Sequence, residues 1–161
     1  MMDIALHALH LLAGALWVGG MLFTGGILGP VLRRDVPPAV RLPLVQTVGR
    51  RFSRAGWAAL AVLALTGLHR VRYLLFCSPR YLTAMPYGRL LSLKLGLFAT
   101  MLSLSLWHDF SLGPALIRLA DRPASPEFKA ASRRLAFWAR VNVLLVVAIV
   151  VIAAALRLTK D

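Results

Sequence analysis

The stretch Leu6-His7-Ala8-Leu9-His10-Leu11-Leu12-Ala13-Gly14-Ala15-Leu16-Trp17-Val18-Gly19-Gly20 decides the fold class, because it is apolar enough to enter a bilayer and still carries two imidazoles. A helix turns by about 100° per residue, which places His7 and His10 on one face. Gly14 and Trp17 follow on the face of His10, at offsets of four and seven residues. Ionisable groups inside a membrane helix indicate a functional site. This helix face therefore offers nitrogen donors beside a small residue and an aromatic ring.

The composition predicts an all-α integral membrane protein. The chain has 161 residues, 59% of them hydrophobic, and a mean hydropathy of +0.73, whereas soluble domains are roughly 45–50% apolar. About 20 apolar residues suffice to cross about 30 Å of hydrocarbon. Four stretches meet this requirement, so we expect a four-helix bundle that forms a single domain over residues 1–161. The expected helices span residues 3–28, 51–77, 89–112 and 134–156.

Glycine and proline set the expected helix ends. Gly29-Pro30 should close the first helix and Gly113-Pro114 the third, and Pro43 should prevent a helix across residues 39–48. Residues 115–133 are polar and are expected to form a short surface helix and a turn. No internal repeat is evident.

The net charge of +13 would suggest a nucleic-acid partner in a soluble protein. Here the basic residues gather at the ends of apolar spans, so the expected partner is the lipid bilayer with its anionic headgroups, and no nucleic acid. The single cysteine, Cys77, excludes an internal disulfide and a cysteine-based metal cluster.

Charge asymmetry predicts the topology. The loops after the first and third helices hold 11 Lys and Arg residues, and the opposite side holds 6, when loop and terminal residues are counted. The positive-inside rule then places both termini outside and both of these loops in the cytoplasm, as in a bacterial inner membrane protein. Cys77 should lie at the outer end of the second helix.

Three ionisable side chains on different expected helices lie at a similar depth. His10 and His69 are both about 10–12 Å from the outer helix ends, and Lys94 enters the third helix from the same side. We therefore expect one cofactor site in the outer half of the bundle. His108, beside Asp109 near the cytoplasmic end, is too distant to share it.

Lys94 also begins a polar stripe on the third helix. Met101, Ser105 and His108 follow it at offsets of seven, eleven and fourteen residues. Because lipid cannot satisfy polar groups, this face is expected to point into the bundle.

Three segments resemble the CopD family of copper-resistance membrane proteins. They are the run from Leu9 to Gly20, Arg51-Phe52-Ser53 followed by Leu65-Thr66-Gly67-Leu68, and Met85-Pro86-Tyr87-Gly88-Arg89-Leu90-Leu91-Ser92-Leu93-Lys94-Leu95. The last is similar to the Thr-x-Tyr-Gly-Arg-Leu-Leu-x-x-Lys segment of that family. The resemblance implies a polytopic membrane protein of copper uptake or homeostasis. Family members often have eight spans, sometimes with a fused periplasmic copper-binding domain, whereas four spans are expected here.

A second resemblance is to the HemJ family of haem-binding membrane proteins, which oxidise protoporphyrinogen. It is carried by His10 on the first helix and by Lys94 and His108 on the third. The resemblance implies that His10 is an axial haem ligand and that Lys94 contacts a propionate or the substrate.

Two functions from different classes remain open. In the first, His7, His10 and His69 bind or pass copper, with methionines as soft ligands. In the second, His10 and His69 ligate haem b from both sides, while Arg70, Arg72 and Lys94 meet its propionates, and Gly14 and Trp17 line the cofactor.

An alternative is a purely structural role, in which the histidines hydrogen-bond neighbouring helices and the Lys94 side chain extends to the membrane–water interface. No nucleophile, carboxylate pair or phosphate-binding loop is visible, so no catalytic residue is predicted and enzymatic activity is left undecided. Candidate partners are a periplasmic copper or electron-transfer protein and a second copy of the chain.

Overall fold

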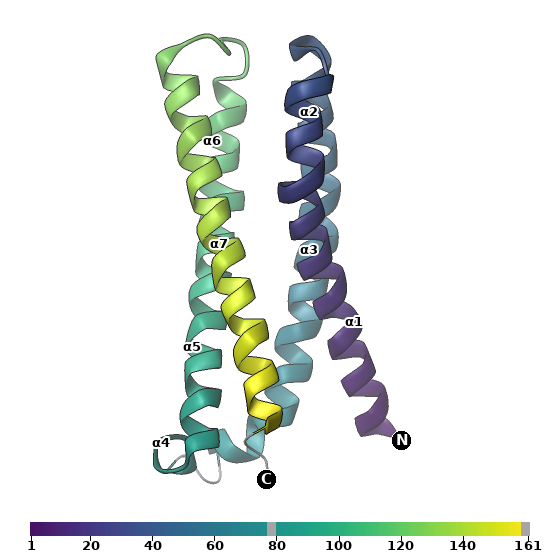
Figure 1. Cartoon of the computed structure of the whole chain (residues 1–161), viewed down its shortest axis with the longest axis vertical. Coiled ribbons are helices and arrows are strands. Elements are labelled where there is room, and N and C mark those ends of the chain that lie inside the picture. Colours follow the sequence, from purple (N-terminus) through teal and green to yellow (C-terminus); the bar gives the residue numbers. More distant parts are fainter. Residues whose placement is uncertain (77–79, 159–161) are drawn as a thin grey trace. The chain divides into compact units, whose positions relative to one another are not determined.

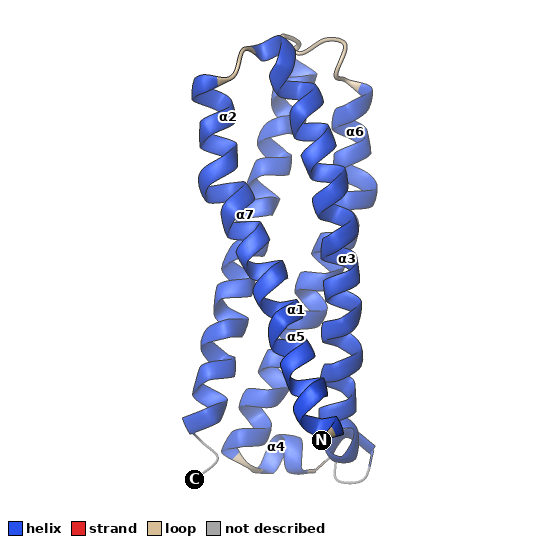
Figure 2. Ribbon diagram, turned by 90° about the vertical axis from the view of Figure 1, so that its right-hand side faces the viewer, coloured by secondary structure: helices blue, strands red, loops and turns tan. Residues whose placement is uncertain are grey.

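The computed structural model describes residues 1–76 and 80–158, and within these ranges it is helical without any strand (Figure 2). The all-α prediction is confirmed. Cys77 and Lys160 lie outside the described residues. The chain divides into two compact units, residues 1–73 and residues 74–161, which we call the first hairpin and the second hairpin.

The first hairpin is a long helix that turns back on itself within two residues (Figure 1, purple to blue). Its outgoing arm runs without interruption over Met2–Asp35. Val36 and Pro37 make the turn, where the Arg41 guanidinium donates to the Val36 carbonyl at 2.9 and 3.3 Å. The elements in order are α1 (Met2–Leu22), the π-helix η1 (Phe23–Leu28), α2 (Gly29–Asp35) and α3 (Pro38–Phe76).

Gly29-Pro30 does not close the first helix, contrary to the sequence-based expectation. Proline lacks an N–H and its ring crowds the carbonyl four residues earlier. The chain accommodates this by the wider turn of η1, in which the Gly29 N–H bonds to the Thr24 carbonyl, five residues back. The Thr24 hydroxyl also donates to the Gly20 carbonyl at 2.8 Å. The helix therefore continues to Asp35.

The expectation that Pro43 prevents a helix across residues 39–48 is also wrong. The return helix α3 begins at Pro38 and contains Pro43 in its second turn. A proline this close to the start of a helix costs one backbone hydrogen bond, and the remaining turns of α3 continue past it. The helix expected from residue 51 thus begins 13 residues earlier.

The second hairpin repeats this construction (Figure 1, teal to yellow). Gly113-Pro114 again follows a π-helix and again does not end the helical path, since the Gly113 N–H bonds to the His108 carbonyl. The return helix begins at Pro126 and not at residue 134, because the Ser125 hydroxyl caps it by accepting the Phe128 N–H at 3.1 Å. The elements are α4 (Tyr81–Ala84), α5 (Pro86–Trp107), η2 (His108–Leu112), α6 (Gly113–Arg118) and α7 (Pro126–Leu158).

Among the residues that the structure describes, three helical paths are long and apolar enough to cross a membrane: Met2–Asp35, Pro86–Arg118 and Pro126–Leu158. Large apolar side chains stand exposed along these paths, as at Leu12 (68%) and Leu144 (70%), which suits contact with lipid tails. The fourth expected span falls in α3, which is not among the three. Its charge-free stretch is limited by Arg54 and Arg70 to about 15 residues, or about 22 Å.

Small residues bring the two arms of the first hairpin together. Trp17 is 6% exposed and packs over Gly56, where an added Cβ would lie 3.5 Å from the indole Cδ1. Phe52 of α3 lies directly against Gly20, where a Cβ has no room. Close approach through glycine is the usual way in which helices pack in lipid, where the hydrophobic effect between helices is absent.

Candidate functional site

Polar side chains line the contact between α1 and α3 in the first hairpin, at the end away from the turn. We call this group the polar seam. It comprises Asp3, His7 and His10 of α1 and Thr66, His69 and Arg70 of α3. Asp3, His7 and His10 follow one another at four and three positions on α1, and His69 and Arg70 follow Thr66 at three and four positions on α3, so each set lies along one side of its helix.

His10 is held by a hydrogen bond to a buried threonine. Its Nδ1 lies 2.7 Å from Thr66 Oγ1, and Thr66 is 4% exposed. The ring lies against Gly67, where an added Cβ would be 3.6 Å from His10 Cε1. The Thr66 hydroxyl has one proton, which it donates to the Val62 carbonyl at 2.6 Å. The imidazole Nδ1 must therefore be the donor, and the neutral ring carries its lone pair on Nε2.

His7 has the opposite arrangement. The Arg70 guanidinium donates to His7 Nδ1, and because arginine has no acceptor, this nitrogen supplies the lone pair. The neutral His7 ring consequently carries its proton on Nε2. A fixed positive charge also stands beside it.

His69 and Arg72 complete this end of the first hairpin. His69 Nε2 lies 3.9 Å from a carboxylate oxygen of Asp3, a side chain that is 92% exposed. The Arg72 guanidinium donates to the His69 backbone carbonyl. Since His10 faces Thr66 and Gly67, His69 lies two to three residues further along α3, about 3–4.5 Å in axial rise.

Gly14 and Trp17 take part in helix packing. An added Cβ at Gly14 would lie 3.8 Å from Leu63 Cδ2, so the space beside this glycine is filled by a leucine of α3. The Trp17 ring is enclosed against Gly56. A role for either residue beside a cofactor stays a prediction.

Lys94 lies half-buried on α5 and belongs to the second hairpin. His10 and His69 belong to the first hairpin, and the grouping of Lys94 with them stays a prediction. His108, at the start of η2, places Nδ1 2.9 Å from the Asp109 carboxylate. His108 therefore pairs with Asp109, the residue that follows it in the sequence.

The polar stripe on α5 leads to a buried cluster in the second hairpin. Met101 is 0% exposed and Ser105 is 9% exposed, as expected for a face that avoids lipid. Ser105 Oγ donates to Met101 Sδ at 3.7 Å and accepts the Asn142 side-chain N–H at 2.9 Å. Asn142 Oδ1 is buried and has no hydrogen-bond partner among the described residues.

Sequence reasoning did not single out Thr66 or Asn142. Thr66 stands in the quoted segment Leu65-Thr66-Gly67-Leu68, but nothing in that segment shows that its hydroxyl meets His10. Asn142 is an amide in a run of apolar residues, which is a recognisable signal for a contact between helices.

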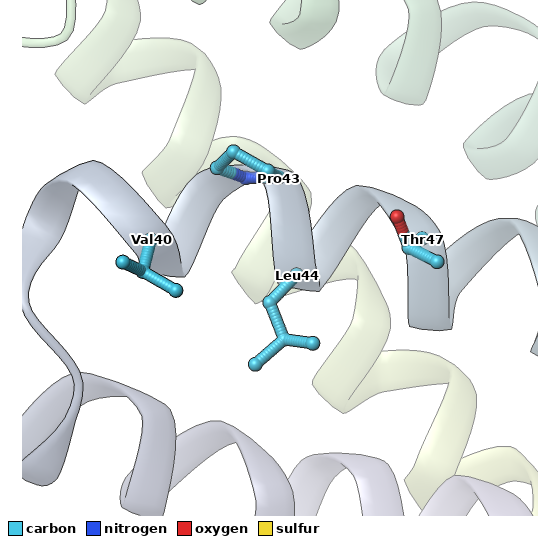
Figure 3. A pocket seen from close by; sticks show the side chains of 4 residues that line it. All are labelled: Val40, Pro43, Leu44 and Thr47. Atoms are coloured by element: carbon cyan, nitrogen blue, oxygen red, sulfur yellow. The ribbon is translucent and has the colours of Figure 1, made fainter.

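The described residues contain no group of three or more His, Cys, Asp and Glu side chains that could hold a metal ion. The proposed set His7, His10 and His69 therefore stays a prediction. An open depression of about 480 Å³ lies on the first turns of α3, lined by Val40, Pro43, Leu44 and Thr47 (Figure 3). Its lining has no ionisable group, so the polar seam is the better candidate site.

The chain is similar in sequence to a known protein family and to a bacterial protein. The family model of copper resistance protein D (CopD) matches residues 46–156. An uncharacterized protein of Aquifex aeolicus (strain VF5) is 34% identical over 106 residues, which cover 65% of this chain and 66%, just under two thirds, of that protein. No solved structure matches the chain.

Proposed function

This chain belongs to the CopD family of copper-resistance membrane proteins, and we propose that it binds copper in copper transport or homeostasis, with His10 and His69 as nitrogen ligands. The family match begins at residue 46 and includes His69 and Lys94. The role of His10, which precedes the matched range, rests on the geometry of the polar seam.

The observation that carries this proposal is the hydrogen bond between His10 and Thr66. A histidine that ligates a metal commonly donates its other ring N–H to a neighbouring acceptor, which fixes the tautomer and the ring orientation. Thr66 supplies that acceptor at 2.7 Å and is itself fixed by the Val62 carbonyl. The hydrogen bond thus fixes the tautomer in which the His10 lone pair is on Nε2, the nitrogen that we propose as the metal ligand.

His69 is the second ligand in this proposal. The Asp3 carboxylate near its Nε2 favours the proton on that nitrogen, which leaves Nδ1 as the donor atom. His7 is a poorer choice, because Arg70 occupies its lone pair and repels a cation. Imidazole suits copper, and two such ligands on adjacent helices are the minimum for a chelate.

A haem held between His10 and His69 does not fit the first hairpin. A macrocycle would have to separate the His10 ring from α3, yet that ring lies in contact with Thr66 and Gly67. The two arginines expected at the propionates bond instead to His7 and to the His69 carbonyl. Copper is therefore the better-supported of the two cofactors.

The proposal includes four spans with both termini outside. In this arrangement α3 is the fourth span, and its short charge-free stretch is extended by Arg54 and Arg70, whose long side chains reach the two interfaces.

A membrane-impermeant thiol reagent should label Cys77 in intact cells. A cysteine placed at Asp121, in a Cys77→Ser background, should be labelled only after permeabilisation. The reverse pattern would overturn this topology.

Copper binding is tested on the detergent-purified chain by competition with a chromophoric Cu(I) chelator. His10→Ala and His69→Ala should each lose most of the copper, whereas His108→Ala, the matched control in the other hairpin, should retain it. Each variant must elute from size exclusion like the unmodified protein. Full retention by folded His10→Ala, or a Soret band in the purified protein, would overturn the proposal.

A further inference from the structure

Arg140 is a charged residue in an apolar part of α7. It is exposed, and it lies on one helix face between two exposed apolar side chains, Phe137 (55%) and Leu144 (70%). No described residue forms a hydrogen bond or ion pair with it. A guanidinium that faces lipid without a counter-charge is costly, so a position of this kind calls for an anion.

Aromatic residues indicate where the membrane surface crosses this hairpin. The Trp107 and Trp138 rings meet edge to face with centroids 5.3 Å apart, and the Arg134 guanidinium lies 5.3 Å from the Trp107 centroid. Tryptophan is enriched at headgroup level. Arg140 is two residues, about 3 Å, beyond Trp138 on the apolar side.

The apolar run that follows supports this placement. Residues 141–156 contain no charged side chain and span about 24 Å as a helix. Hydrocarbon is about 30 Å thick, so Arg140 lies just inside its edge. Helical side chains lean toward the N-terminus of their helix, which directs the Arg140 guanidinium back toward headgroup level.

The chain supplies no carboxylate for Arg140 among its described residues. Asp109 is within 2.9 Å of His108, and Glu127 lies in the first turn of α7, 13 residues away. The nearest charges on α7 are instead basic, at Arg133 and Arg134. Arg133 is seven residues before Arg140 on the same face.

We propose that Arg140, assisted by Arg133, binds the phosphate of an anionic phospholipid at this membrane surface. A guanidinium matches two phosphate oxygens at once. The basic surroundings disfavour a headgroup that carries its own ammonium group, so the site discriminates between anionic and zwitterionic lipid by charge. This site is independent of the proposed copper ligands.

The test is lipid retention in native mass spectrometry of the full chain, with thermal stabilisation in detergent as a second readout. Phosphatidylglycerol should bind and stabilise, and phosphatidylcholine and inorganic phosphate should not. Arg140→Gln should weaken phosphatidylglycerol binding about fivefold, since one arginine near an anionic surface contributes about 1 kcal/mol. Arg140→Lys should fall between, because it keeps the charge and loses the paired contact.

Arg157→Gln is the matched control, since it removes the same charge from the last turn of the same helix. It should leave phosphatidylglycerol binding unchanged. Equal losses in Arg140→Gln and Arg157→Gln would show diffuse charge attraction and overturn the site. Unchanged binding in folded Arg140→Gln, or equal stabilisation by inorganic phosphate, would overturn it as well.

Discussion

The two hairpins share one construction and differ in the chemistry they carry. In each, a long apolar helix passes through a π-helix and a Leu-Gly-Pro sequence into a short helix, turns, and returns in a long helix. The matching segments are Leu28-Gly29-Pro30-Val31-Leu32-Arg33-Arg34 and Leu112-Gly113-Pro114-Ala115-Leu116-Ile117-Arg118. The structure thus reveals a repeat that was not evident from the sequence.

Aligning the two hairpins on their glycines exposes the difference. Trp17 and Met101 each precede the glycine by 12 residues, and both are buried, at 6% and 0% exposure. His10 and Lys94 each precede it by 19 residues. Equivalent positions therefore share a packing role in the middle of the helix, while the polar position nearer its N-terminus holds an imidazole in one hairpin and an amine in the other.

The return helices differ in the same way. In the first hairpin α3 meets α1 through Thr66, which orients an imidazole. In the second, α7 meets α5 through Asn142, whose amide reaches a serine and no ionisable group. The two hairpins thus share one helical scaffold, whereas the metal-binding capacity that we propose belongs to the first hairpin.

The most severe test of this difference is to give the first hairpin the residue of the second. His10→Lys removes the proposed ligand and adds a cation beside the metal, so the Cu(I) affinity should fall on the order of a hundredfold or more. Competition with a Cu(I) chelator measures this affinity. Lys94→Gln is the companion variant, which alters the equivalent position of the second hairpin. Unchanged Cu(I) affinity in folded His10→Lys would contradict both the ligand role of His10 and this difference between the hairpins.

Thr66→Val should reduce Cu(I) affinity about tenfold, because the loss of an outer hydrogen bond to a ligating histidine typically costs 10–100-fold. Thr66→Ser restores the hydroxyl and should recover most of the affinity. Helix packing alone would make the Val variant, which keeps the shape, behave like the native protein. That result would refute a positioning role for Thr66.

Asn142→Leu should have a small effect on stability. An interhelical hydrogen bond in a membrane protein contributes about 0.6 kcal/mol on average, and the change also removes the unpartnered Oδ1. The unfolding free energy should therefore change by less than about 1 kcal/mol, measured by titration with denaturing detergent. Cu(I) affinity should be unchanged, and a marked loss would place part of the copper site in the second hairpin.

His108→Ala should have the smallest effect. His108 pairs with Asp109 in η2 and belongs to the second hairpin, so copper content per folded protein should equal that of the native chain. Inductively coupled plasma mass spectrometry of the purified variant measures it. A large loss of copper would contradict the assignment of copper to the first hairpin.

The sequence by itself determined the helical, membrane-type character of the chain and its family resemblance. Hydropathy and residue spacing report these directly, since an apolar run can satisfy its backbone in lipid only as a helix. The burial of Met101 and Ser105 followed from the same spacing. The helix ends could not be predicted in this way. Pro30 and Pro114 each follow a π-helix and leave the helical path unbroken, and Pro126 is the first residue of a helix.

Only the tertiary structure decided which ring nitrogen of each histidine carries the proton. His7 and His10 are similar in sequence, three residues apart on one helix face. Their partners on α3 come from more than 50 residues away, and one is an arginine that donates while the other is a threonine that accepts. A tautomer depends on the partner across the helix contact, and no local pattern in the sequence contains that information.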